Sequence, residues 1–159
     1  MNAALTIRDA VAADLEDVRS LFREYAAGLG IDLCFQGFDQ ELATLPGRYA
    51  PPSGRLLLAE RGGALAGVIA LRDLSGGVCE MKRLYVRDFA RGTGAGRALA
   101  ERLVAEAKAA GYRAMRLDTL RSDMPRANAL YEALGFREIG AYYENPVAGV
   151  RYMELDLGT

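Results

Sequence analysis

Apolar and polar residues alternate along "ALTIRDA" (4–10), a pattern typical of a β-strand with one buried face. In "DLEDVRSLFREYAAGL" (14–29) the apolar residues instead recur every three or four positions, which predicts an amphipathic helix. A shorter helix is predicted over 38–45, and the proline and glycine content of 47–54 predicts a loop. The N-terminal part of the chain is therefore expected to form one strand followed by two helices.

The middle of the chain predicts a meander of three antiparallel strands. "RLLLAER" (55–61) and "ALAGVIALRDL" (64–74) are rich in apolar residues, and the Gly-Gly pair between them is a strong hairpin signal. "SGG" (75–77) then makes a second turn into "VCEMKRLYVR" (78–87). Consecutive strands joined by such short turns pair in antiparallel fashion.

The second half of the chain alternates helices and strands. The predicted elements are a helix over 96–111, a strand over 112–120, a helix over 125–135, and strands over 136–145 and 150–157. The whole order, β-α-α-β-β-β-α-β-α-β-β, predicts an α+β fold in which a mixed, mostly antiparallel twisted sheet of about seven strands is flanked by about four helices. Without a linker or an internal repeat, residues 1–159 are expected to form one domain.

Composition and charge narrow the class of protein. Apolar residues make up 51% of the chain, which suits a packed core. The net charge of −1 lacks the basic footprint of a nucleic-acid-binding protein. No apolar run is long enough to span a bilayer, and the N-terminus lacks a signal-peptide pattern. We therefore expect a cytoplasmic protein that binds neither nucleic acid nor membrane.

The chain contains no histidine. Ser-His-Asp chemistry, Cys-His chemistry and histidine-ligated zinc are therefore excluded, and any general acid or base must be a carboxylate, tyrosine, lysine, cysteine or water. The two cysteines, Cys34 and Cys79, lack metal-site spacing, so we expect two reduced, buried thiols and no metal.

The segment "RDFARGTGAG" (87–96) places three glycines just before a predicted helix. The first turn of a helix leaves backbone N–H groups without intrahelical partners, and the helix dipole adds partial positive charge there. Glycines let a phosphate approach that backbone closely, and Arg91 adds a charged donor. Residues 80–102 also carry six basic side chains against three acidic ones. The segment therefore predicts a phosphate site, although a glycine-rich turn without a ligand fits the same residues.

The spacing of the glycines shows which of the known phosphate-binding motifs this segment matches. A P-loop requires a lysine directly after its last glycine, and no lysine follows here. The dinucleotide pattern Gly-x-Gly-x-x-Gly/Ala fails from either starting glycine, because Arg97 or Leu99 occupies its last position. The pattern that fits is Arg-x-x-Gly-x-Gly, formed by Arg91, Gly94 and Gly96.

This motif, preceded by a strand ending in "RLYV" and followed by "NALYEALGF", resembles the GNAT superfamily of N-acetyltransferases. The resemblance covers nearly the whole chain in element order and is sharpest over 79–136. It implies the GNAT-like acyl-CoA N-acyltransferase fold, with acetyl-CoA as cosubstrate and direct attack of a primary amine on the thioester in a ternary complex. An acyl-CoA-binding sensor without turnover is the alternative, and a nucleotide-binding protein is disfavoured by the failed motifs.

The resemblance also assigns roles to individual residues. The CoA pyrophosphate is expected against Arg91, Gly92, Thr93, Gly94, Ala95 and Gly96, with Arg97 adjacent. The preceding strand is expected to hold the pantetheine arm and acetyl group through the main chain of Leu84, Tyr85 and Val86, beside a bulge. Asn128 matches a residue that contacts the cofactor arm. Tyr131 matches the tyrosine that donates its proton to the CoA sulfur, although packing alone also accounts for an aromatic residue there.

Glu80 is the candidate general base. It lies on the strand before the glycine segment, where histone-type members of the family carry a catalytic glutamate. Regular alternation puts Glu80 on one face with Lys82, Leu84 and Val86, unless a bulge shifts the phase. A salt bridge from Glu80 to Lys82 or Arg83 is an equal alternative, and many family members lack a dedicated base. The backbone N–H groups near Leu84 to Val86 are the expected oxyanion donors.

The acceptor is expected to bind between segments 25–52 and 140–151, where the family varies most. The candidate residues are Asp32, Asp39 and Glu41 for an amine, Arg48 and Arg55 for a carboxylate, and Tyr142, Tyr143, Glu144 and Asn145 on the second segment. A small amine or amino acid, a protein N-terminus and a lysine side chain all remain open as acceptors. The family also brings the expectation of a homodimer, with "YMELDL" (152–157) as a contact edge.

Overall fold

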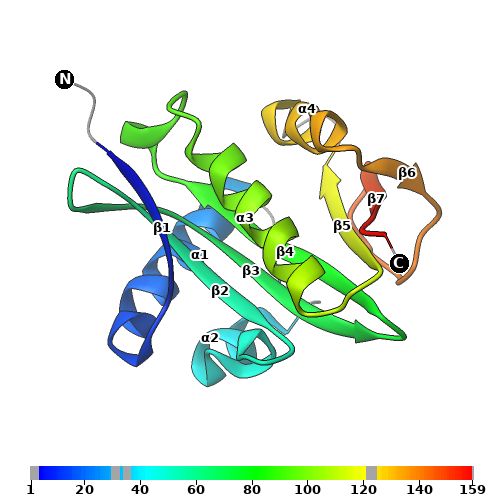
Figure 1. Cartoon of the computed structure of the whole chain (residues 1–159), viewed down its shortest axis with the longest axis horizontal. Helices are drawn as coiled ribbons and strands as arrows, with labels where there is room; N and C mark the ends of the chain where they lie inside the picture. Colours follow the sequence, from blue (N-terminus) through cyan, green and yellow to red (C-terminus); the bar gives the residue numbers. More distant parts are fainter. Residues whose placement is uncertain (1–3, 30–32, 34–36, 121–124, 159) are drawn as a thin grey trace.

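A computed structural model of the chain describes residues 4–29, 33, 37–120 and 125–158, and it contains a seven-stranded sheet with helices on both faces (Figure 1). The strands are β1 (Leu5–Asp9), β2 (Arg55–Arg61), β3 (Ala64–Ser75), β4 (Val78–Val86), β5 (Ala114–Leu120), β6 (Arg137–Ile139) and β7 (Val150–Asp156). The helices are α1 (Leu15–Leu29), α2 (Phe38–Thr44), α3 (Ala95–Ala109) and α4 (Pro125–Leu134), with short 3₁₀ turns at Ala12–Asp14, Gly47–Tyr49 and Asp88–Ala90.

The strand order is β1-β2-β3-β4-β5-β7-β6, and every pair is antiparallel except β4 with β5. The predicted element order and the mixed, mostly antiparallel sheet are therefore confirmed. The hairpin between β2 and β3 turns through Gly62 and Gly63, both with positive φ, as the sequence predicted.

Alternating side chains on the strands build two separate cores. On β2, Leu57 and Ala59 pack with α3 and α4, whereas Leu56 and Leu58 pack with α1 and α2. All four of these side chains are buried, which explains why the middle of β2 is a continuous apolar run instead of alternating with polar residues. The sheet thus lies between two helical layers, with α3 against its middle strands (Figure 1).

The segment 140–149 departs from the prediction. A strand was expected over 136–145, but β6 ends at Ile139 and the chain then leaves the sheet. The hydroxyls of Tyr142 and Tyr143 donate hydrogen bonds to Glu80 on β4 and to Asp118 on β5. These contacts draw the segment across the sheet instead of along its edge, so the strand prediction is wrong beyond β6.

The C-terminal strand is not the open edge that was expected for a dimer contact. β7 pairs with β5 along its whole length, and Tyr152, Met153 and Glu154 also pair with β6. Because β6 covers these three residues, only the end of "YMELDL" remains at the edge of the sheet. Among the residues described, none of the helices has the length and apolar character needed to cross a membrane.

A bulge interrupts β4. Two steps along β3, from Val68 to Ala70, correspond to three steps along β4, from Tyr85 to Lys82. Arg83, at the bulge, has a φ of 62°, which is unusual for a residue other than glycine. The bulge reverses the alternation, so Leu84 packs on the α3 side instead of sharing a face with Lys82. The expected alternation therefore holds only as far as Lys82, and the bulge shifts the phase beyond it, which is the exception that the sequence prediction allowed.

Gly67 allows β3 and β4 to approach each other beside this bulge. A Cβ atom at Gly67 would lie 2.6 Å from the carbonyl oxygen of Tyr85 and 3.2 Å from a methyl group of Leu99. We expect Gly67→Ala to lower the free energy of unfolding by about 1–3 kcal/mol, because the extra methyl group overpacks a buried site. Urea denaturation measures the change.

Gly28→Ala provides the matched control, because it adds the same methyl group in α1 with no other atom within 4 Å. We expect this variant to keep the stability of the wild type or to gain up to about 1 kcal/mol. Equal stability of the two variants would contradict the close approach at Gly67.

Candidate active site

A cavity of about 850 Å³ lies beside β4, where this strand separates from β5. The two parallel strands pair only from Val78 to Glu80 on β4, so the sheet opens beyond that point. The lining residues come from α1 (Tyr25, Gly28, Leu29), β4 (Leu84, Tyr85, Val86), the segment that leads into α3 together with its first two residues (Ala90, Arg91, Gly92, Gly94, Ala95, Gly96), and α4 (Arg126, Ala127, Leu130). The volume is that of a pocket for an extended organic ligand.

The glycine segment forms one end of this cavity. Gly94 precedes α3 with a φ of 88°, and Gly92 has a φ of 78°. A Cβ atom at either position would meet nothing within 4 Å, so the backbone is bare toward the cavity. Arg91 is held at the rim, where its Nε donates to the carbonyl oxygen of Val86 at 3.1 Å and its guanidinium pairs with Asp88 at 2.6 Å. The segment therefore has the open backbone and positive charge that a diphosphate needs.

A second, smaller space adjoins the inner end of the cavity. This chamber, of about 30 Å³, is lined by Tyr25, Met81, Lys82, Arg83, Leu84, Leu117, Asp118 and Tyr131. It shares Tyr25 and Leu84 with the cavity, so the two spaces lie next to each other. Tyr131 projects from α4 and is buried, and this burial raises the pKa of its phenol. The phenol is therefore protonated throughout the neutral range.

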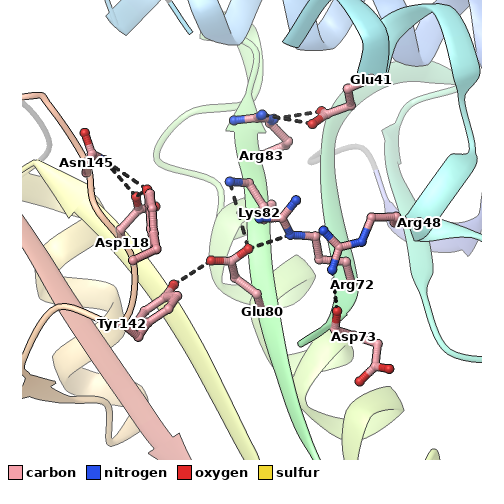
Figure 2. Close-up of polar contacts among 11 residues, drawn as sticks. Glu41, Arg48, Arg72, Asp73, Glu80, Lys82, Arg83, Asp118, Tyr142 and Asn145 are labelled. Atoms are coloured by element: carbon pink, nitrogen blue, oxygen red, sulfur yellow. Dashed lines mark hydrogen bonds and ion pairs between the residues drawn. The ribbon is translucent and has the colours of Figure 1, made fainter. Parts of the chain in front are cut away.

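Lys82, Arg83 and Asp118 line the chamber, and Glu80 lies next to Lys82 in the same cluster of charged side chains (Figure 2). Glu80 is 1% exposed, and its two carboxylate oxygens are both engaged. Oε1 accepts a hydrogen bond from Arg72 at 2.7 Å and lies 4.0 Å from Lys82, while Oε2 accepts one from Tyr142 at 2.5 Å. Burial alone would raise the pKa of Glu80, but the charges of Lys82 and Arg72 bring it below its ordinary value. Glu80 is therefore a firmly held carboxylate.

The other charges near the chamber are also held by specific partners. Arg83 is 3% exposed and donates two hydrogen bonds to Glu41 of α2, at 2.9 and 3.0 Å. Asp118 Oδ2 accepts hydrogen bonds from the Tyr143 hydroxyl and, at 3.1 Å, from Asn145 Nδ2. Segment 140–149 thus donates hydrogen bonds to Glu80 on β4 and Asp118 on β5, at the point where the two strands separate (Figure 2).

Comparison with known proteins identifies the family. The model of the Acetyltransferase (GNAT) family matches residues 15–136, which include the glycine segment, the chamber residues of β4 and β5, and Tyr131. The chain belongs to the GNAT family of acetyltransferases. It is therefore an acetyl-CoA-dependent acyltransferase.

Individual relatives of this acetyltransferase cover nearly its whole length. An uncharacterized N-acetyltransferase of Schizosaccharomyces pombe is 43% identical over 147 residues, which span 91% of this chain and 89% of that protein. A GNAT acetyltransferase structure from Staphylococcus aureus Mu50 has a TM-score of 0.78 at 21% identity, over 97% of this chain and 99% of that one. An acetyltransferase from Salmonella typhimurium, solved with its cofactor acetyl-CoA, has a TM-score of 0.73 at 23% identity, over 97% and 94%. Both structures share the fold.

Most of the predicted cofactor residues of this acetyltransferase line the cavity, and four do not. Tyr131 borders the chamber instead. The Thr93 hydroxyl donates to the carbonyl oxygen of Ala90, and Arg97 pairs with Glu101 on the exposed face of α3 at 2.5 Å. Asn128 donates from its side-chain amide to the carbonyl oxygen of Leu120 at 3.0 Å. Thr93 thus stabilises the turn, while Asn128 joins α4 to the end of β5.

The contributions of α1 and α4 to the cavity were not predicted from the sequence. The residues concerned are Tyr25, Gly28 and Leu29 on α1 and Arg126, Ala127 and Leu130 on α4. The α1 residues lie about sixty positions before the glycine motif, and their small or apolar character carries no ligand signal. Arg126 could have been predicted as a ligand-binding residue. It is a basic residue in the first turn of a helix, next to the motif "NALYEALGF".

The candidate acceptor residues fall into two groups. Tyr142, Tyr143 and Asn145 contact carboxylates beside the chamber, and Glu41 pairs with Arg83 at its wall. The remaining described candidates lie on the outside or contact backbone carbonyls, namely Asp39, Arg48, Arg55 and Glu144. Asp32 and Cys34 lie outside the described residues.

Cys79 is a buried structural thiol. It is 0% exposed within the core under α3, and this burial raises its pKa to about 12. A thiol of such high pKa supplies almost no thiolate near neutral pH, so nothing in its surroundings favours a covalent acetyl-cysteine route.

Proposed function

We propose that this protein transfers an acetyl group from acetyl-CoA to a primary amine by direct attack of the amine within a ternary complex. The observation that carries the proposal is the junction between the cavity and the chamber. The cavity suits an elongated thioester with a diphosphate at one end, and the polar chamber at the other end suits an amine. Leu84 and Tyr25 border both spaces, so the thioester carbon and the amine nitrogen would meet there.

Binding is assigned to the backbone of the glycine segment and of β4. The N–H groups at the start of α3, with Arg91, would hold the pyrophosphate. Beyond the bulge, the main chain of Leu84, Tyr85 and Val86 would hold the pantetheine arm, because β5 no longer pairs with β4 there. Thr93, Arg97 and Asn128 would contribute by shaping the turn and placing α4.

Two groups are assigned to the reaction itself. An N–H of β4 between Leu84 and Val86 would stabilise the tetrahedral oxyanion, because β5 pairs with β4 only as far as Glu80 and leaves this part of the strand unpaired on that side. Tyr131, kept protonated by its burial, would give its proton to the departing CoA sulfur. The assignment of Glu80 as the base that receives the proton of the amine stays a prediction.

The test is the release of free CoA thiol from acetyl-CoA in the presence of a panel of small amines, amino acids, polyamines and peptides. We expect release that depends on one class of amine and a matching acetylated product by mass spectrometry. Calorimetric binding of acetyl-CoA without thiol release on any acceptor would instead favour the acyl-CoA sensor. ATP or NAD binding tighter than CoA binding would count against the assignment of the cavity.

A further inference from the structure

We propose that Lys82 is the general base of the transfer, and that Glu80 positions it. The inference rests on the proposed function, because it concerns the amine that would enter the chamber. Lys82 and Tyr131 both line this space of about 30 Å³, one from β4 and the other from α4. The base and the acid would then face the same reacting centre from two elements.

The position of Lys82 on β4 fits this role. It comes directly before the bulge, two residues ahead of Leu84, which borders both the cavity and the chamber. A space of about 30 Å³ admits an amino group or about two water molecules, so the proton passes directly or through a water. Glu80, the base expected from the sequence, does not border the chamber.

The choice of lysine at this position is informative. Lys82 and Lys108 are the two lysines of the chain, and arginine supplies every other basic side chain, including Arg72 and Arg83 beside the chamber. An arginine stays protonated in a protein, whereas a buried lysine can lose its proton. Lys108 is exposed at the end of α3, and Lys82 is 6% exposed. The chain thus places at the chamber its one buried cation that can act as a base.

The surroundings of Lys82 favour its neutral form. Burial, followed by the neighbouring charge of Arg83, lowers the pKa of Lys82 to about 8, against the opposing effect of Glu80 and Asp118. Within the part of the chain that the structure describes, the charged and titratable groups around it include Arg72 on β3, Glu80 and Arg83 on β4, Asp118 on β5, Tyr131 on α4, Tyr25 on α1, and Tyr142 on the segment 140–149. A base whose pKa lies near the working pH is the most effective one.

Glu80 then acts through Lys82 and is a positioning residue. Each of its two oxygens accepts a short hydrogen bond, one from Arg72 and one from Tyr142, and these bonds hold the carboxylate away from the chamber lining. Its Oε1 lies 4.0 Å from Lys82 Nζ, so its charge raises the pKa of Lys82 without receiving the proton of the amine.

The protons and bonds balance as follows. The amine nitrogen forms a bond to the acetyl carbon, and its proton passes to the lone pair of Lys82 Nζ. The carbon–sulfur bond then breaks as the Tyr131 hydroxyl gives its proton to the sulfur. Lys82 returns a proton to the Tyr131 phenolate across the chamber, so both side chains end as they began. The net products are the acetylated amine and free CoA thiol.

The test compares kcat/KM from pH 6 to 10 for the wild type, Lys82→Arg and Glu80→Gln, with Lys108→Arg as the matched control. For the wild type, kcat/KM should rise with pH to a plateau above about 8, because the neutral lysine is the active form. Lys82→Arg keeps the ion pair with Glu80 but cannot release its proton, so we expect a loss of roughly 100- to 10⁴-fold at every pH. Acetyl-CoA affinity by calorimetry should stay within about threefold of the wild type, as should all properties of Lys108→Arg.

Glu80→Gln separates the two candidate bases independently of Lys82→Arg. Removing the nearby anion lowers the pKa of Lys82 further, so the rise in kcat/KM should move to lower pH by about one unit or more while the plateau remains. The titration of the acceptor itself is the same for all variants, so this shift belongs to the protein.

Two results would overturn the assignment of Lys82. One is full activity of Lys82→Arg, which a merely structural ion pair predicts. The other is a Glu80→Gln variant that loses its activity at all pH values, which would return the base to Glu80. A wild type that binds acetyl-CoA but acetylates no amine would instead overturn the proposed function, and this inference with it.

Discussion

Gly94→Asp should abolish binding of acetyl-CoA, with a rise of at least about 100-fold in the dissociation constant. The carboxylate would point into the space beside the start of α3, where nothing lies within 4 Å of the Cβ position and where the diphosphate is proposed to bind. Negative charge would then face negative charge in a partly enclosed cavity, where repulsion is less screened than in water. Isothermal titration calorimetry with acetyl-CoA measures the effect.

Gly94→Asn is the matched control for backbone strain. Gly94 has a φ of 88°, and asparagine enters this left-handed region more readily than most residues. The asparagine side chain has nearly the shape of aspartate but no charge, so we expect it to weaken binding by no more than about tenfold. Equal losses in the two variants would mean that shape or strain matters here rather than phosphate charge. Wild-type affinity of Gly94→Asp would place the diphosphate elsewhere.

Much of the fold was predictable because local signals and tertiary structure agree. Glycine pairs marked the β-turns, the apolar periodicity of α1 and α3 marked their buried faces, and Gly111 marked the end of α3. The glycine motif was equally visible, because the positive φ values of Gly92 and Gly94 favour glycine over other residues. The end of the cavity where the diphosphate is proposed to bind could therefore be predicted from local sequence.

The acceptor end was not predictable in the same way, because its geometry depends on contacts between distant residues. The bulge uses Arg83, whose positive φ is not signalled by its residue type and which pairs with Glu41 forty-two positions earlier. Tyr142 and Tyr143 are of a residue type that is common in strands, yet their hydroxyls contact Glu80 and Asp118. These long-range polar contacts determine the local structure, which therefore differs from the strand that the local sequence predicts.

Long-range contacts also explain why the sequence could not distinguish between the candidates for the general base. The sequence pattern placed Glu80 and Lys82 on one face of a strand. It left open whether Glu80 is the catalytic base or only forms a salt bridge. Only the structure shows that Arg72 and Tyr142 engage the carboxylate, whereas the lysine borders the chamber. Which member of a buried ion pair acts on a substrate depends on the third and fourth partners, and these come from other strands and segments.

Tyr131→Phe should lower kcat by between about 10- and 10⁴-fold while acetyl-CoA affinity stays close to that of the wild type. The variant removes one hydroxyl from the chamber and keeps the ring, which packs edge-on against Phe136 with centroids 5.9 Å apart. Without this acid the sulfur must leave as a thiolate. Because burial raises the pKa of Tyr131, its phenol stays protonated, so the loss should be the same from pH 6 to 9. Steady-state thiol release measures it.

Tyr112→Phe is the matched control, because it removes a tyrosine hydroxyl that donates to the carbonyl oxygen of Ser53, among residues that border neither the cavity nor the chamber. Its kcat should equal that of the wild type. A lost acid acts on the chemical step, so Tyr131→Phe should lower kcat and kcat/KM for the amine together. A loss confined to KM would instead make Tyr131 a binding residue for the acceptor. An unchanged kcat would rule out the acid role and leave water to protonate the sulfur.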